Sequence, residues 1–139
     1  MLAINFFSED VSFSLPKPAV TSAWIVNVLN HENAKAENIN YVFCSDDHLL
    51  NINKKYLNHD YMTDIITFDN SEQHKIIEAD IYISIDRVKE NASQLKKTFK
   101  DELDRVMIHG VLHLLGYNDK TEDEIIEMRK KEDASLSLR

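Results

Sequence analysis

A chain of 139 residues with 43% hydrophobic content is long enough to bury one core without disulfides or a structural metal, so we expect a single domain over residues 1–139. Two glycines, two prolines and one cysteine exclude collagen-like, low-complexity and disulfide-framework proteins. A formal net charge of −8 argues against broad non-specific binding to nucleic acid, which depends on the release of counterions from phosphates.

The first third of the chain predicts short strands followed by a helix. Residues 3–7 and 11–15 carry short β-type patterns. Pro18 then lies where the first turn of a helix tolerates proline. Apolar side chains recur at helical spacing through residues 20–29, which is typical of a helix that packs on a sheet.

The middle of the chain predicts three more strands and one more helix. INYVFC (39–44) and DIITF (64–68) are short apolar β segments, and ADIYISI (79–85) is apolar enough to be a central strand. Between them, residues 45–57 begin with capping residues and repeat apolar positions at helical spacing, so they predict a helix.

The last third predicts helices only. Residues 86–95 and 101–115 have helical patterns, and Gly116 ends the second of them as a C-terminal glycine usually does. TEDE at 121–124 matches a capping box and opens a charged helix that runs to about Leu136. The order of elements predicts an α+β (α/β-like) fold with one mixed sheet and helices packed on it.

The stretch HGVLHLLGYND (109–119) contains the pattern H-x3-H-x2-G-x2-D. On a helix His109 and His113 project from the same side, which suits two nitrogen ligands of one metal ion. Gly116 lets the chain turn, so Asp119 can return as a third ligand, as the third histidine does in metzincins. The alternative interpretation is an ordinary helix with two histidines and a loop aspartate.

Gly110 argues against a metallopeptidase, because the peptidase signature has a glutamate there as general base. Three protein ligands and an open position still allow a metal-bound water to act as nucleophile on a phosphoryl or carbonyl group. No side chain is predicted as a catalytic acid or base.

Three segments resemble the YbeY family of metal-dependent endoribonucleases and rRNA maturation factors. HGVLHLLGYND resembles H-G-x-L-H-L-x-G-Y-D-H, residues 52–68 resemble L-N-x-x-Y-R-x-x-D-x-P-T-D-V-L-S-F, and residues 79–84 resemble G-D-I-x-I-S. The resemblance covers nearly the whole chain. It implies a mixed-sheet fold, one bound zinc ion, and single-strand-specific cleavage of RNA in maturation of the small-subunit rRNA 3′ end and in ribosome quality control, with an rRNA precursor and the small ribosomal subunit as partners.

Two positions depart from that family pattern. Asp119 stands where the family has its third histidine, so the expected ligands are two imidazoles and a carboxylate, which lets iron or manganese compete better with zinc. Leu57 stands where the family has an arginine suited to binding phosphate. Lys54, Lys55 or Arg105 are the expected replacements for that positive charge in substrate binding.

Alternatives from other classes remain open at this point. A ribosome-associated binding factor with a structural metal explains the acidic composition and Leu57 equally well, and a metallopeptidase is disfavoured by Gly110. Lys96, Lys97 and Lys100 form a basic patch whose simpler interpretation is a solvated helix face. With no signal peptide, no stretch that could span a membrane and a lone Cys44, we expect a cytoplasmic protein that does not bind membranes.

Overall fold

The structure, a computed structural model, describes residues 3–59 and 62–139. In chain order the described residues form β1 (Ile4–Ser8), α1 (Pro18–His31), β2 (Lys35–Cys44), α2 (Asp46–Leu57), β3 (Ile65–Asp69), β4 (Ile76–Ser84), α3 (Ile85–Leu95), α4 (Phe99–Leu114) and α5 (Glu122–Leu136). No helix among them is long and apolar enough to cross a membrane.

The four strands form one mixed sheet in the order β1-β2-β4-β3. The first three are parallel, with Tyr41 of β2 opposite Ile81 of β4. β3 runs antiparallel to β4, with Ile66 opposite Tyr82, and lies at an edge of the sheet. The α+β class with a single mixed sheet, predicted from the sequence, is confirmed.

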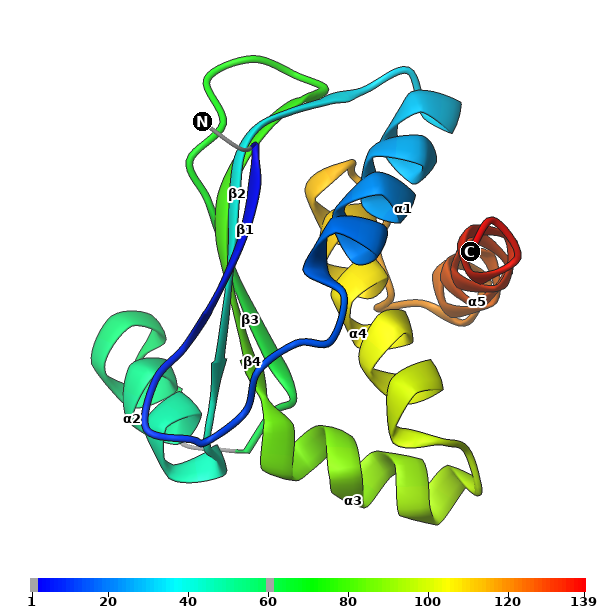
Figure 1. Cartoon of the computed structure of the whole chain (residues 1–139). Coiled ribbons are helices and arrows are strands. Elements are labelled where there is room, and N and C mark those ends of the chain that lie inside the picture. Colours follow the sequence, from blue (N-terminus) through cyan, green and yellow to red (C-terminus); the bar gives the residue numbers. More distant parts are fainter. Residues whose placement is uncertain (1–2, 60–61) are drawn as a thin grey trace.

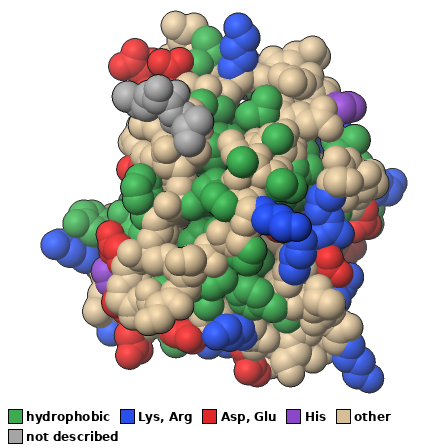
Figure 2. Space-filling model, viewed as in Figure 1, with side chains coloured by type: hydrophobic (Ala, Val, Ile, Leu, Met, Phe, Trp, Pro, Cys, Tyr) green, Lys and Arg blue, Asp and Glu red, His purple; other side chains and the backbone are tan. Residues whose placement is uncertain are grey.

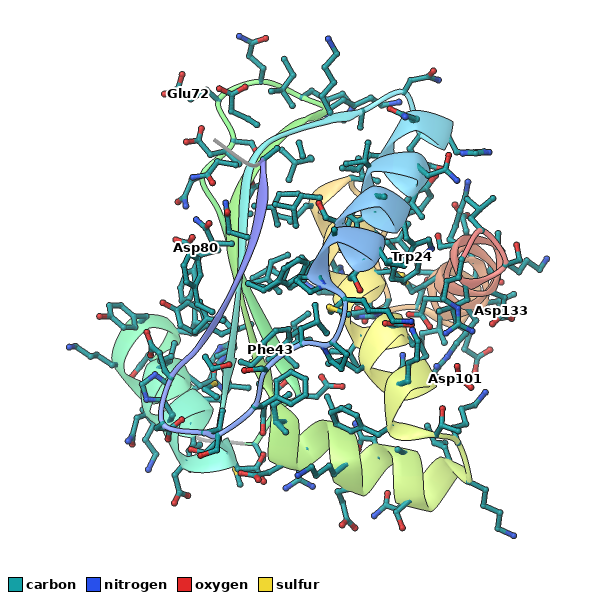
Figure 3. All side chains as sticks on the ribbon, viewed as in Figure 1. Trp24, Phe43, Glu72, Asp80, Asp101 and Asp133 are labelled. Carbon is teal, nitrogen blue, oxygen red and sulfur yellow. The ribbon has the colours of Figure 1, made fainter. Side chains whose placement is uncertain are left out.

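The helices cover the two faces of the sheet unequally. Figure 1 shows α1 and α4 against one face with α5 beyond them, and α2 on the other face. The main core lies on the α1–α4 side, where the fully buried Tyr41 donates its hydroxyl to the Met107 carbonyl at 3.0 Å. In Figure 3 Trp24 and Phe43 lie on this side, whereas Asp80 lies on the opposite side of the sheet.

An apolar cavity opens between β1 and α1. Figure 2 shows hydrophobic side chains gathered in the middle of this face of the molecule. The cavity has a volume of about 750 Å³ and is lined from β1, the loop that follows it and the start of α1, with Phe6, Phe13 and Ala19 among its walls. Among the described residues that line it none is charged, so these residues supply no carboxylate, imidazole or thiol.

Hydrogen bonds cap the start of α4 and α5 and join α5 to α1. Thr98 caps α4 by accepting from the Asp101 amide at 3.1 Å, and Thr121 forms the predicted capping box of α5. The indole of Trp24 donates to the Ser135 carbonyl at 2.8 Å, so it ties α1 to the far end of α5. The Trp24 contact therefore holds α5 against α1.

Residues 11–15 were predicted as a strand, and this prediction is wrong. They form a loop between β1 and α1 whose Phe13 ring packs edge-on against Phe43 and Phe99, at centroid distances of 5.0 and 5.8 Å. The alternating pattern reflects side chains that cover the core, without a neighbouring strand to pair the backbone. Ile85 was also assigned to a strand, but it begins α3 because Ser84 caps that helix.

Candidate metal centre

Three side chains near the end of α4 converge as the sequence predicted. Nε2 of His113 lies 3.2 Å from Oδ2 of Asp119, and Nε2 of His109 lies 3.4 Å from the same oxygen. One ligand atom from each of the three residues lies within 4.8 Å of the others. Within the described part of the chain this is the one group of His, Cys, Asp or Glu side chains arranged to hold a metal ion.

Local structure explains the convergence. His109 and His113 lie one turn apart on α4, and their rings meet nearly at right angles with centroids 4.5 Å apart. The helix ends at Leu114, and Gly116 has a φ of 103°, in a region of backbone conformation that favours glycine. The chain therefore turns back within three residues and brings Asp119 to the histidines.

The donor set and its spacing fit a transition-metal ion. Ligands at about 2.0–2.1 Å from the centre of a tetrahedron lie about 3.3–3.4 Å from one another. The two separations from Asp119 Oδ2, 3.2 and 3.4 Å, are close to this length, and all three ligand atoms lie within 4.8 Å of one another. The cluster of two imidazoles and one carboxylate could therefore hold a metal ion with little rearrangement.

A cleft of about 440 Å³ adjoins this cluster. Its walls are the C-terminal end of α2, the segment that leads into β3, and the edge strand β3 itself. Leu57, which occupies the family's arginine position, lines this cleft and is 40% exposed. The side chain of Asp119 is 39% exposed, so the cluster faces solvent on the cleft side.

A chain of charged side chains lies behind His109. Nδ1 of His109 contacts Oε2 of Glu132 at 2.6 Å, and the Arg105 guanidinium lies 3.3 Å from the other Glu132 oxygen. Arg105 also binds both oxygens of Glu102, at 2.9 and 2.5 Å. Burial opposes ionisation of Glu132, but the hydrogen bond to His109 and the charge of Arg105 outweigh it and lower its pKa.

Asp64 is a second acid that sequence reasoning did not single out. It lines the cleft just before β3 and accepts a hydrogen bond from the Asn91 side chain at 3.3 Å. Burial raises the pKa of Asp64 above its ordinary value, although Arg105 and His109 oppose the shift. Asp64 lies within the segment 52–68 that carries the family resemblance, which was the available signal; for Glu132 the sequence had none.

The predicted substrate contacts lie in different places. Lys54 and Lys55 are exposed in the last turn of α2, between two residues that line the cleft, and Lys55 Nζ lies 5.3 Å from the centre of the Tyr56 ring. Arg105 lies beside His109 but is held by two carboxylates, and its pKa is raised chiefly by the hydrogen bonds to Glu102.

The basic patch at residues 96–100 lies at the other end of α4. Lys96 and Lys97 are exposed where α3 gives way to α4, and Lys100 pairs with Asp104 at 2.7 Å. At 1.5 Å per residue, Lys100 is roughly 13 to 20 Å along the helix axis from the two histidines of the cluster.

Fold and cluster together define a class: an α+β protein with one mixed sheet and a cluster suited to metal binding that opens on a cleft at the sheet edge. The sequence model of the family described as Endoribonuclease YbeY matches residues 4–138. The chain belongs to this family, as its motifs predicted.

Individual relatives agree with this membership. The protein from Cytophaga hutchinsonii named Endoribonuclease YbeY is 54% identical over 136 residues, which cover 98% of this chain and 95% of that protein. The protein of the same name from Amoebophilus asiaticus is 54% identical over 129 residues, or 93% of this chain and 88% of that protein. The solution structure of TM1509 from Thermotoga maritima matches 97% of this chain and 87% of its own, with a TM-score of 0.69 and 25% identity.

Proposed function

We propose that this protein is a metal-dependent endoribonuclease that cuts single-stranded RNA during maturation of the small-subunit rRNA 3′ end, with a role in ribosome quality control. The observation that carries the proposal is the His109, His113 and Asp119 cluster at an open cleft, in a chain of the endoribonuclease YbeY family. The small ribosomal subunit as partner stays a prediction of the family resemblance, and a cytoplasmic location stays a prediction from the sequence.

Zinc is the proposed ion, held by His109, His113 and Asp119. When bound, the ion supplies Lewis-acid polarisation of a phosphodiester and a water activated for attack. The carboxylate ligand gives the site one oxygen in place of nitrogen, so iron and manganese are the proposed competitors. Asp64, half-buried at the cleft with a raised pKa, is the described carboxyl best suited to hold a proton there.

Lys54 and Lys55 are the proposed RNA contacts, since they stand where α2 borders the cleft and Leu57 offers no charge. Arg105 adds positive charge beside His109, but its hydrogen bonds to Glu102 and Glu132 occupy the guanidinium. We therefore give the direct phosphate contacts to the lysines.

Substitution of Asp119 tests the metal site. We expect Asp119→Ala to weaken zinc binding by more than about 100-fold, because a direct ligand should exceed the loss of 10- to 100-fold that outer partners cause. Asp119→His should retain zinc, and Asp119→Asn should retain it poorly, since the shape stays but the charge is lost. Competition with a chromogenic chelator measures all three, with the exposed Asp133→Ala as control. Unchanged zinc affinity in Asp119→Ala would show that Asp119 is a loop residue and not a metal ligand.

Cleavage of an rRNA precursor separates the enzyme from a binding factor with a structural metal. We expect the zinc-loaded protein to cut single-stranded but not duplex RNA, and His113→Ala to abolish cutting. A parent protein that binds the precursor and zinc without turnover would favour the binding factor. The metallopeptidase stays disfavoured, because position 110 carries no carboxylate and packs against β3 and β4.

Salt dependence tests the RNA contacts. Each phosphate contact with a single strand contributes about 0.7 to the slope of log K against log salt. Removing Lys54 and Lys55 together should therefore lower the slope by about 0.7 to 1.4. Lys96→Ala with Lys97→Ala is the matched control at the far end of α4. A larger change of slope in the control pair would show that RNA binds at that end of α4 instead.

A further inference from the structure

The contacts behind His109 form a continuous chain through two helices. His109, Arg105 and Glu102 lie on successive turns of the same side of α4, and Glu132 reaches them from α5. Glu132 uses one oxygen for His109 Nδ1 at 2.6 Å and the other for Arg105 at 3.3 Å. Each carboxylate oxygen of Glu132 therefore has a partner on α4.

Burial makes these contacts obligatory. The side chains of Glu102 and Glu132 are 0% and 2% exposed, and that of Arg105 is 16% exposed. An ionised carboxylate removed from water is costly unless it is paired and hydrogen-bonded. Arg105 contacts both Glu102 and Glu132, and the exposed Arg129 lies 3.6 Å from Glu132. His109 therefore makes the shortest of these contacts with Glu132, at 2.6 Å.

The partner at Nδ1 also indicates which nitrogen of His109 acts as donor. An ionised carboxylate can only accept, so the Nδ1 atom that contacts Glu132 is the donor. In a neutral imidazole the other nitrogen, Nε2, then has its lone pair free. Nε2 is the atom that lies 3.4 Å from Asp119 and faces the candidate metal centre.

We propose that Glu132 is a positioning residue of the metal centre: it holds His109 as the Nδ1–H tautomer with Nε2 directed at the ion, while Arg105 and Glu102 hold Glu132 in place. This inference rests on the proposed metal site. It assigns α5, which supplies no metal ligand in the proposed set, a part in metal affinity. A hydrogen-bonded carboxylate also makes the imidazole a stronger ligand and limits its rotation.

The rival explanation is that Glu132 only joins α4 to α5. Both explanations predict a loss of stability when Glu132 is replaced, so stability cannot separate them. Only the positioning role predicts a change in the tautomer of His109 in the metal-free protein and a change in zinc affinity at equal folded fraction.

The test compares Glu132→Gln with Glu127→Gln, an exposed acid on the same helix. Glutamine keeps the size of the side chain, but its amide can also donate, so His109 is released to adopt either tautomer. We expect zinc affinity, measured by chelator competition, to fall 10- to 100-fold in Glu132→Gln and to stay within about twofold in the control. Long-range proton–nitrogen NMR spectra of the metal-free proteins should show the Nδ1–H form of His109 in the parent and a mixture in the variant.

A second variant, Arg105→Lys, tests the proposal if Glu132→Gln does not fold. Arg105→Lys keeps the charge but loses the two-sided contact with both acids, so it should weaken zinc binding in the same direction by a smaller factor. Unchanged zinc affinity and an unchanged His109 tautomer in a folded variant would overturn the proposal. A parent that binds no zinc would instead overturn the proposed metal site, and the NMR comparison would still decide whether Glu132 controls His109.

Discussion

Gly110 lies where α4 packs closely on the sheet, and we expect its replacement by alanine to bring no gain in stability. A methyl group at this position would lie 2.9 Å from Cδ1 of Ile65 and 3.3 Å from Cγ2 of Thr67. The first separation is shorter than real carbon contacts allow, so Ile65 must move or α4 must shift away from β3. Either change alters the packing beside the metal cluster.

The expected magnitude follows from two opposing effects. Alanine in place of glycine inside a helix stabilises by about 0.8–1 kcal/mol. Overpacking a filled site costs about 1–3 kcal/mol. We therefore expect Gly110→Ala to lower the free energy of unfolding by about 1 kcal/mol, within a range of about 0–2 kcal/mol, although helix propensity alone predicts a gain.

A double-mutant cycle with Ile65→Val isolates the contact. Valine lacks Cδ1, and Ile65→Val alone should cost about 0.5–1.5 kcal/mol. In the double variant the methyl group added at position 110 meets no Cδ1, so the combined loss should be smaller than the sum of the single losses by at least about 0.5 kcal/mol. Urea unfolding followed by circular dichroism measures all four proteins. A stabilised Gly110→Ala, or additive losses in the cycle, would refute the inferred contact between position 110 and Ile65.

Three further predictions concern other parts of the chain. Burial opposes ionisation of Glu32, but hydrogen bonds from Tyr117 and Lys131 outweigh it and hold its pKa below the ordinary value. Its stabilising contribution is therefore present above the unfolded pKa near 4.5 and is lost as pH falls through the folded pKa. The difference in free energy of unfolding between the parent and Glu32→Gln should shrink on acidification, and a constant difference would contradict this. Burial first, and nearby carboxylates second, raise the pKa of Cys44 to about 12, so a thiol reagent at about pH 8 should label the protein only after unfolding. Thr121→Ala should cost about 1 kcal/mol in urea unfolding through loss of the α5 cap, and a cost below about 0.3 kcal/mol would show that the capping box contributes little.

The sequence by itself determined the elements whose signals are local. The interval between His109 and His113 is one helical turn, and Gly116 supplies the turn that returns Asp119, so the convergence of these three side chains could be predicted from eleven consecutive residues. The capping box at Thr121 could also be predicted from the sequence, because its hydrogen bonds join residues three apart. Helix geometry relates such short intervals directly to positions in space.

Tertiary structure decided everything that depends on partners distant in the chain. The alternation in residues 11–15 suits a strand, but a strand also needs a neighbour, and the structure uses Phe13 to cover the core instead. Glu132 reads as one more acid in a charged helix until α5 packs on α4 and places it 2.6 Å from His109, 23 residues earlier. Asp64 likewise reaches the cleft through the pairing of β3 with β4. Periodicity shows which face of an element is buried, whereas the packing of the whole chain decides what that face contacts.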